Sequence, residues 1–419
     1  MTKRIVRREG QQSLSFTSPL LARILSTRGV LKAGDLDHSL KGLFAPDSFL
    51  GIAQAATILA DALESDSSIL IVGDFDADGA TSCTLMVTAL RAMGGRQVNY
   101  LVPDRFKFGY GLTPEIVDVA VQFEPTVIVT VDNGIASVEG VAHANSLGIS
   151  VIVTDHHLPG HELPAAAAIV NPNQAGCNFP SKSLAGVGVA FYLLSVLRTE
   201  LRSRNWFAHH PEINLASFLD LVALGTVADV VPLDQNNRRL VEEGIRRIRG
   251  GHCRPGLKAM LLAAGVNPQH LTTRDLAFSI APRLNAAGRL QDMSIGIECL
   301  LADEVRAPEL AEHLDALNNE RKEIETDMRD MALAHLKQLS LDEETAAGLC
   351  FYRPDWHQGV VGIVASRIKE KSHRPVIAFA PVGGGELKGS GRSVAGFHLR
   401  DALDAIATRH PGLLLKFGG

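Results

Sequence analysis

Several features that mark other protein classes are missing from this sequence of 419 residues. It has only five cysteines and no Cys-x-x-Cys pair, which argues against a zinc ribbon and against a disulfide framework. No apolar run approaches the roughly 18 residues of a membrane-spanning helix, and residues 1–9 lack the apolar stretch of a signal peptide. These absences favour a reduced cytoplasmic protein without membrane association.

A strongly basic composition is also missing. The sequence has 41 lysines and arginines against 46 aspartates and glutamates, a net charge of -5, which does not mark a nucleic-acid-binding protein. It does not exclude one either, because an acidic catalytic cluster can offset basic patches elsewhere. The hydrophobic content of 46% is ordinary for a soluble globular protein, and the length corresponds to two or more domains.

Short apolar segments alternate with helical patterns between about residues 49 and 154. We expect strands over 68–73, 98–102, 126–131 and 150–154, separated by helices at 81–92, 114–122 and 137–147. This alternation is typical of a parallel sheet with helices on both faces. The sequence therefore predicts an α/β fold for its central part.

The domain limits follow from changes in composition. Residues 1–47 are expected to form a lead-in of short helices and loops, and residues 48–300 a catalytic domain with a helical extension. A charge-rich stretch without Pro or Gly, from Glu309 to about residue 339, predicts a long helix that bridges two domains, assigned to 301–340. Short strands and glycine-rich turns at 383–391 predict a smaller α/β domain over 341–419.

Three alternating aspartates follow the first expected strand directly. Asp74, Asp76 and Asp78 would repel one another unless cations lie among them, and the carboxyl end of a strand is where open α/β sheets bind ligands. An EF-hand loop would need a bidentate Glu at its twelfth position, which here is Leu85. An acidic surface turn is the alternative interpretation.

Two more expected strands end in polar motifs, Asp132-Asn133-Gly134 and Asp155-His156-His157, and Asp229 lies within an apolar stretch. Turn chemistry, surface histidines and a helix cap are the respective alternatives. Carboxylates and imidazoles together suit Mn²⁺ or Mg²⁺ better than a zinc site with cysteine ligands. Jointly the motifs predict a two-metal site, about 3.5–4 Å across, for phosphodiester or phosphoanhydride hydrolysis.

Candidate phosphate ligands lie outside these motifs. Ser390 and Arg392 lie in a glycine-rich segment within a locally basic region, residues 366–400. Arg105 lies in a loop with Phe106 and Tyr110, whose rings could stack on bases. Arg283 and Arg289 flank a small-residue segment, 284–288, that we expect to be a turn able to cradle a phosphate. Structural arginines or a solvated basic face would look the same, and a packed loop would explain the two aromatic residues equally well.

In their order along the chain, these motifs resemble the DHH phosphoesterase superfamily, and within it the RecJ exonucleases specific for single-stranded DNA. Segments 73–79, 130–134, 155–157 and 225–229 look like its four metal-site motifs. Segments 282–289 and 356–362 are typical of RecJ rather than of the whole superfamily. The resemblance implies a DHH-type parallel sheet, a long bridging helix and a smaller, DHHA1-type domain that grips nucleic acid.

The resemblance also implies roles for individual residues. Two Mn²⁺ or Mg²⁺ ions would be held by the catalytic set Asp76, Asp78, Asp132, His156, His157 and Asp229. Asp74 would be a further metal ligand, and Asp155 would orient the site without binding a metal. The 5′ end or nearby phosphates would be held by Arg105, Arg289, Ser390 and Arg392, with Arg283 as a further candidate.

The implied activity is stepwise 5′→3′ release of 5′-mononucleotides from single-stranded DNA during recombination and repair. We expect a monomer that works beside single-strand-binding protein and a helicase. The alternatives are a DHH phosphodiesterase or pyrophosphatase acting on short oligonucleotides, cyclic dinucleotides or small phosphate esters, and a non-catalytic DHH scaffold. The family pattern continues through Gly-Gly-His into an OB-type fold, whereas this sequence stops at Gly418-Gly419, so we expect a fragment or a short form.

Overall fold

A computed structural model of the chain describes residues 15, 17–104, 107–108, 110–338, 347–410 and 412–415. The chain forms two compact units, and the boundary between them falls after Leu317. We call Val6–Leu317 the larger unit and the part from Asn318 onward the smaller unit.

The larger unit is built on a five-stranded sheet in which every neighbouring pair is parallel. The strand order is β2-β1-β3-β4-β5. The strands are β1 (Ile69–Gly73), β2 (Val98–Leu101), β3 (Val127–Val131), β4 (Ser150–Thr154) and β5 (Ala168–Val170). This confirms the predicted parallel α/β sheet, in which β2 and β5 are the outer strands.

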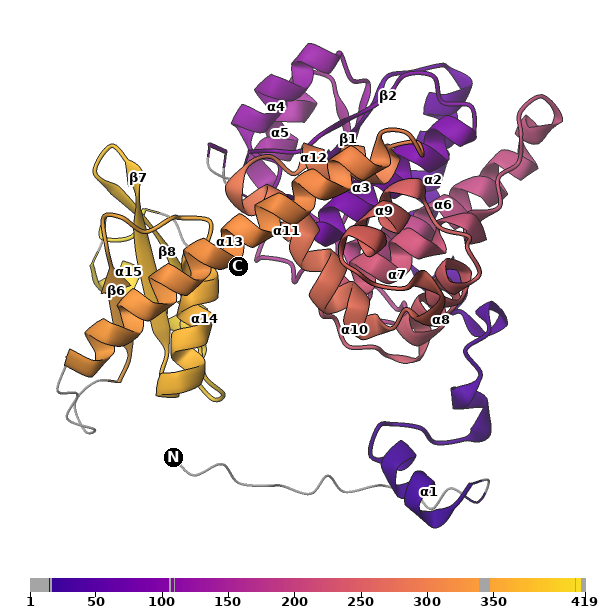
Figure 1. Cartoon of the computed structure of the whole chain (residues 1–419). Helices are drawn as coiled ribbons and strands as arrows, with labels where there is room; N and C mark the ends of the chain where they lie inside the picture. The colour runs from indigo at the N-terminus through magenta and orange to yellow at the C-terminus, as the bar shows by residue number, and fades with distance from the viewer. Residues whose placement is uncertain are drawn as a thin grey trace. The chain divides into compact units, whose positions relative to one another are not determined.

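Helices cover both faces of this sheet (Figure 1). Alternate residues of the central strands enter two different cores, as the two-residue period of a strand requires. Val129 packs in the core that includes α2 (Ile52–Glu64) and α3 (Ala77–Ala92). Its neighbour Ile128 packs in the opposite core with α4 (Pro114–Ala120) and α5 (Val138–Ser146).

The order of the strands determines where a ligand site can form. The chain runs from β1 to β2 on one side and later returns to form β3 on the other side of β1. The carboxyl ends of β1 and β3 thus flank a switch point, the position where open α/β sheets leave a crevice. Because all five strands are parallel, the segments that follow β1, β3 and β4 emerge at the same edge.

The rest of the larger unit is helical. Its remaining α-helices are α1 (Pro19–Ser26), α6 (Gly186–Ser203), α7 (Leu219–Ala228), α8 (Gln235–Arg249), α9 (Pro255–Ala263), α10 (Thr273–Asp275), α11 (Ala281–Leu290) and α12 (Ser294–Leu301). Short 3-10 turns occupy Ala33–Leu36, Leu40–Gly42, Pro46–Ser48, Val121–Phe123, Trp206–Ala208, Leu215–Phe218 and Pro268–His270, and Leu276–Ile280 is π-helical.

One local prediction for this unit is wrong. Residues 284–288, expected to be a phosphate-cradling turn, lie inside helix α11. Their small side chains serve packing instead, because a Cβ at Gly288 would lie 2.1 Å from the carbonyl oxygen of Phe75. The helix thereby approaches the loop after β1 closely.

The long helix α13 (Ala307–Gln338) contains the boundary between the units, and it confirms the predicted bridging helix. The smaller unit then has a three-stranded sheet in the order β6-β7-β8, with β6 parallel and β8 antiparallel to β7. Its elements are β6 (Leu349–Tyr352), α14 (Val361–Ser372), β7 (Val376–Gly383), β8 (Glu386–Arg392) and α15 (Leu399–Arg409).

The expected glycine-rich turn at 383–391 is wrong over most of its length. Only the part around Gly384 and Gly385 is a turn, and residues 386–392 form strand β8. A Cβ at Gly389 would lie 2.6 Å from a ring carbon of Phe379, and one at Gly391 would lie 2.3 Å from Leu399 Cδ2. These two glycines therefore permit close side-chain packing rather than backbone approach to a phosphate.

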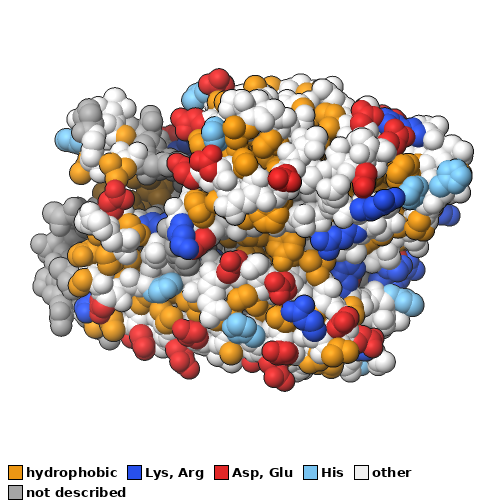
Figure 2. Space-filling model, turned by 90° about the horizontal axis from the view of Figure 1, so that it is seen from above, with side chains coloured by type: hydrophobic (Ala, Val, Ile, Leu, Met, Phe, Trp, Pro, Cys, Tyr) orange, Lys and Arg blue, Asp and Glu red, His pale blue; other side chains and the backbone are white. Residues whose placement is uncertain are grey.

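Within the described residues, no single helix is long and apolar enough to span a membrane. Segments Leu40–Ser48 and Ile52–Glu64 reach that length only as a pair, which is bent by 90°. Acidic and basic side chains are interspersed with apolar ones over the face of the molecule seen in Figure 2. This mixture accords with the nearly balanced composition.

Candidate metal centre

The loop between β1 and α3, together with the first turn of α3, carries three candidate ligands. Asp76 is the N-cap of α3, and its carboxylate accepts hydrogen bonds from the amides of Asp78 (2.9 Å) and Gly79 (3.0 Å). A helix N-terminus favours a negative charge at this position. The loop is tight, since a Cβ at Gly79 would lie 2.4 Å from the carbonyl oxygen of Asp74. Three carboxylates are thus brought to the carboxyl end of β1.

A second helix N-terminus holds the buried carboxylate of Asp78. The amides of Gly186 and Val187, which begin α6, donate to it at 2.6 and 3.0 Å. Gly225 of α7 passes close by, because a Cβ there would lie 2.6 Å from Asp78 Oδ1. No local sequence pattern indicates that either helix contacts Asp78.

Asp132 follows β3 in the left-handed region, with a φ of 62°. Aspartate tolerates this conformation better than most residues. The next side chain, Asn133, is buried and donates from Nδ2 to the carbonyl oxygens of Val72 and Val131, which ties the loop to β1 and β3. This backbone geometry holds the Asp132 carboxylate, which is only 2% exposed, at the edge of the sheet.

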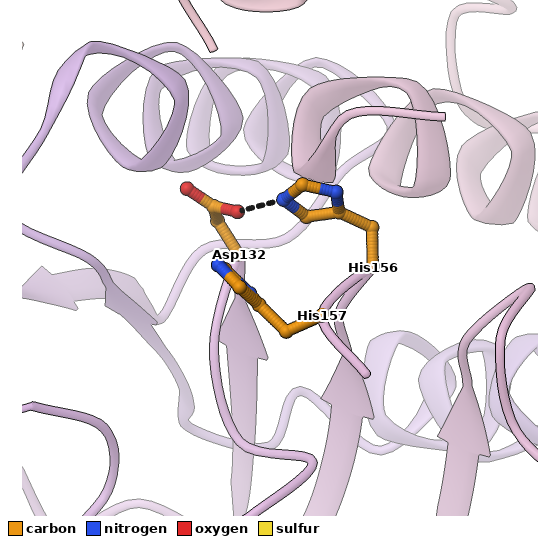
Figure 3. Close-up of side chains that lie close together, drawn as sticks. All are labelled: Asp132, His156 and His157. Carbon is orange, nitrogen blue, oxygen red and sulfur yellow. Dashed lines mark ion pairs between the residues drawn. The ribbon is translucent and has the colours of Figure 1, made fainter. Parts of the chain in front are cut away.

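The loop after β4 brings both histidines to one site. The carboxylate of Asp155 accepts from the amides of His156 (2.7 Å) and His157 (3.1 Å) and pairs with His157 Nδ1 at 2.7 Å. Its other oxygen accepts from the amide of Ile135 at 2.9 Å. Adjacent side chains normally diverge, but this tight turn lets both rings lie beside Asp132 (Figure 3). Asp155 therefore orients the pair.

Asp229 also lies close to His156. It is the C-cap of α7, an end where the helix dipole offers a carboxylate no stabilisation. His156 Nε2 lies 3.4 Å from Asp229 Oδ2 and 3.1 Å from Asp132 Oδ1. One imidazole thus stands between carboxylates supplied by two different elements.

The candidate ligands form three overlapping groups, each with its ligand atoms within 4.8 Å of one another. The groups are, in order, Asp132, His156 and His157; Asp78, His156 and Asp229; and Asp74, Asp76 and Asp132. Asp132 is shared by the first and third groups, and His156 by the first and second. The structure thus brings together all seven side chains that the sequence predicted as metal ligands.

Burial and mutual repulsion shift the acid–base properties of this cluster. Burial and the charge of Asp229 raise the pKa of Asp78 well above its ordinary value, and burial and the charge of Asp78 do the same for the pKa of Asp132. Burial and the charge of Asp76 raise the pKa of Asp229 to about 7. Such carboxyl groups ionise readily only when positive charge is nearby.

The two histidines shift in opposite directions. Burial and the neighbouring His157 lower the pKa of His156 to about 4, so its ring is neutral and able to coordinate a cation. Burial alone would lower the pKa of His157, but its hydrogen bond with Asp155 outweighs this effect and raises the pKa to about 9. A cation that binds to Nε2 of His157 would displace the proton from that nitrogen.

The donor set fits divalent cations. Asp132 Oδ1 and His156 Nε2 are buried and make no hydrogen bond to any part of the chain that the structure describes. Buried polar atoms of this kind are normally satisfied, and a cation between them would satisfy both. Five carboxylates and two imidazoles match the oxygen-rich preference of Mg²⁺ or Mn²⁺.

Tyr110 belongs to this site, although the sequence left it undecided between stacking and packing. Its hydroxyl donates to the carbonyl oxygen of Asp132 at 3.3 Å and lies 3.1 Å from His157 Nδ1. Its ring meets that of Phe75 edge-on, with centroids 6.0 Å apart. The aromatic residues after β2 were the available signal, but their direction depends on a loop that the sequence does not specify.

The candidate phosphate ligands are more dispersed. Arg105 lies outside the described residues. Arg283 is paired with Asp315 at 2.6 Å, and its side chain is mostly buried. Arg289 lies in the last turn of α11. In the smaller unit, Ser390 and Arg392 are neighbours on β8, where Arg392 Nη1 donates to Ser390 Oγ at 3.1 Å.

Comparison with known proteins places these features in a family. Residues 68–226 match the DHH family, N-terminal domain, and residues 345–419 match the DHHA1 domain. The single-stranded-DNA-specific exonuclease RecJ of Escherichia coli (strain K12) is 58% identical over 405 residues, which span 96% of this chain and 70% of that protein.

Solved structures agree with the sequence comparison. A crystal structure of exonuclease RecJ bound to manganese is similar with a TM-score of 0.75 and 35% identity, over 90% of this chain and 89% of that one. RecJ from Thermus thermophilus in complex with Mn²⁺ is similar with a TM-score of 0.77 and 34% identity, over 96% of this chain and 55% of that one.

Proposed function

This chain belongs to the RecJ family of single-stranded-DNA-specific exonucleases, and we propose that it releases 5′-mononucleotides stepwise from the 5′ end of single-stranded DNA. The observation that supports this proposal most is the convergence of seven ligand side chains at the switch point of the sheet. A single metal ion would not need three overlapping groups of ligands.

We assign two Mn²⁺ or Mg²⁺ ions to this centre. The ions would be held by Asp76, Asp78, Asp132, His156, His157 and Asp229, with Asp74 as a further ligand. When bound, such a pair of ions activates water for attack and stabilises charge on the attacking and leaving oxygens. Asp132 and His156 each belong to two ligand groups, so each would contribute to holding a cation together with either set of neighbours.

The remaining residues of the site position these ligands. The Asp155 carboxylate fixes the His157 ring through Nδ1, which leaves Nε2 to face a cation. The amides of Gly186 and Val187 hold the carboxylate of Asp78 in place. Tyr110, whose hydroxyl reaches both His157 and the backbone of Asp132, joins the loop after β2 to the centre.

Phosphates of the DNA strand need hydrogen-bond donors, some of them cationic, outside the metal centre. We assign this role to Arg289 in the larger unit and to Ser390 and Arg392 in the smaller unit, and Arg105 remains a candidate. Arg283 is a weaker one, because its guanidinium already pairs with Asp315. Arginine suits such contacts because its planar group can donate two hydrogen bonds to one phosphate.

The wider biological assignments rest on family membership. We place the protein in the cytoplasm as a monomer that acts in recombinational and mismatch repair. Single-strand-binding protein and a helicase are the partners we expect, since a helicase supplies the single strand that such an enzyme consumes.

Mononucleotide release from 5′-labelled single-stranded DNA tests the proposal directly. We expect release from the labelled end in Mn²⁺ and none in excess chelator. On a 3′-labelled copy of the same strand, the label should stay on the remaining strand as it shortens, and it should be released only late in the reaction. Equal loss of both labels, or release that a chelator does not affect, would contradict the proposed function.

A further inference from the structure

Val230 has a strained backbone conformation, although its side chain is exposed. Its φ is 62°, in the left-handed region, where a β-branched L residue is a genuine outlier. The other described non-glycine residues with positive φ are Asp66, Glu124, Asp132, Asn205 and His373, none of them β-branched. Such strain costs stability and persists where something else offsets it.

Packing within the chain does not offset this strain. The Val230 side chain is 83% exposed, so its methyl groups gain almost nothing from burial. Its backbone amide donates to the carbonyl oxygen of Val227 at 3.4 Å, a bond that any non-proline residue could make. Glycine or asparagine would satisfy this backbone at lower cost. Nothing that the described residues contribute therefore offsets the strain at Val230.

The position of Val230 identifies the kind of contact. It follows Asp229 directly, and the carboxylate of that residue lies 3.4 Å from His156 Nε2. Leu158, the residue after His157, is likewise aliphatic and 79% exposed. A single exposed leucine needs no explanation. A strained valine beside a metal ligand does need an explanation. Under the proposed function, the end of the substrate strand reaches this place during the reaction.

We propose that Val230 makes an apolar contact with the base of the 5′-terminal nucleotide, whose bond to the next phosphate is cleaved at the metal centre, an inference that rests on the proposed exonuclease function. An aliphatic contact with a base face carries no sequence information, because every base offers an apolar face. It would hold the terminal nucleotide in register for release whatever its identity.

The strain is tested on the metal-free protein by thermal unfolding. Val230→Gly should raise the melting temperature by about 1–3 °C, because glycine adopts this φ without steric cost. Glu124→Gly is the matched control: Glu124 has a φ of 47°, is exposed and lies at the amino end of β3, away from the metal centre. A melting temperature that falls in Val230→Gly while it rises in Glu124→Gly would overturn the strain argument.

The contact itself is tested with two substrates that differ only at the 5′ nucleotide, which carries a base in one and is abasic in the other. On the complete strand, Val230→Gly should raise KM about three- to tenfold and leave kcat within about twofold, as expected for loss of an apolar contact. On the abasic strand the two proteins should have the same KM. Val230→Ile should behave as wild type on both, and Glu124→Gly should leave KM unchanged.

The outcomes separate the contact from the wider proposal. Equal effects of Val230→Gly on the two strands, or no effect on either, would refute the contact while the nuclease function stood. A wild-type protein that released nothing from either strand would contradict the proposed function. Equilibrium binding of the same two strands, followed by fluorescence anisotropy, would then still show whether Val230 and the terminal base interact.

Discussion

The aspartate-rich edge of the larger unit and the glycine-rich segment of the smaller unit both look like ligand sites in the sequence. In the structure, the first brings seven potential ligands into three overlapping groups. The second is a β-strand, in which Gly389 and Gly391 make room for Phe379 and Leu399. A buried carboxylate is costly unless a cation or donors compensate it, whereas a glycine has several ordinary structural uses. Clustered buried acids are therefore the more reliable signal.

Removing a metal ligand should have the largest effect. Asp132→Ala or His157→Ala should lower kcat/KM by at least about 10³-fold, because either change breaks a ligand group while the sheet remains intact. The matched control is the carboxylate–imidazole pair Asp118 and His143, 2.7 Å apart on α4 and α5. Alanine at both control positions should leave turnover unchanged. Near-normal turnover in Asp132→Ala would refute the metal-site assignment.

Crowding the ligands should have the next largest effect. A Cβ at Gly186 would lie 2.6 Å from Asp132 Cβ and 2.7 Å from its Oδ1, so Gly186→Ala must displace this ligand. We expect metal affinity to fall about 10- to 100-fold, as it does when the supporting residues of metal sites are changed. Isothermal titration with Mn²⁺ measures this. An unchanged dissociation constant would show that the Asp132 carboxylate is not a ligand.

The pKa shifts predict how the metal-free protein responds to pH. The pKa of Asp229 is raised to about 7 and that of His157 to about 9, so both groups bind more protons in the folded than in the unfolded state. Stability must then fall as pH rises through these values. His156, whose pKa is lowered to about 4, has the opposite effect, but only below about pH 6.5.

The melting temperature without metal should therefore drop by several degrees between pH 6.5 and pH 8.5. Saturating Mg²⁺ should flatten or reverse the slope, because cations replace the lost protons. Differential scanning fluorimetry across this range, with and without Mg²⁺, makes the comparison. A metal-free melting temperature that climbs over the same interval would mean that the cluster is already neutralised by other groups.

The glycine-rich strand should show the smallest effect and no effect on metal. A Cβ at Gly391 would lie 2.3 Å from Leu399 Cδ2, a flexible side-chain end, so Gly391→Ala should cost about 1–3 kcal/mol of stability in the smaller unit. Leu399→Ala in the same chain should restore part of it. Manganese affinity should be unchanged in both variants, and a weakened metal centre would be inconsistent with the separate roles of the two regions.

Much of the larger unit follows from local sequence rules. The β-branched runs that became β1, β3 and β4, each followed by a polar motif, are enough to predict a parallel sheet and ligands at its carboxyl edge. The groups that fix those ligands are not predictable in this way. The amide of Gly186 that holds Asp78 lies 108 residues away in sequence, and no local pattern reports such a contact.

The errors have the same physical origin. Residues 284–288 were expected to be a turn because of their small side chains and a glycine, which disfavours a helix interior. In α11 the glycine is instead required by the close approach to Phe75. Arg283 stays a candidate phosphate ligand, but its pairing with Asp315, 32 positions later, could not be predicted either. Tertiary contacts overrule local preference at these places.

The central claim is that this chain holds two divalent cations at the edge of its sheet. Titration of the metal-free protein with Mn²⁺, followed by calorimetry and by electron paramagnetic resonance, tests it most directly. The account predicts two ions per chain with the magnetic coupling of neighbours about 3.5–4 Å apart, and the loss of that coupling in Asp132→Ala. One uncoupled ion per chain, or an Asp132→Ala protein that still binds a coupled pair, would contradict it.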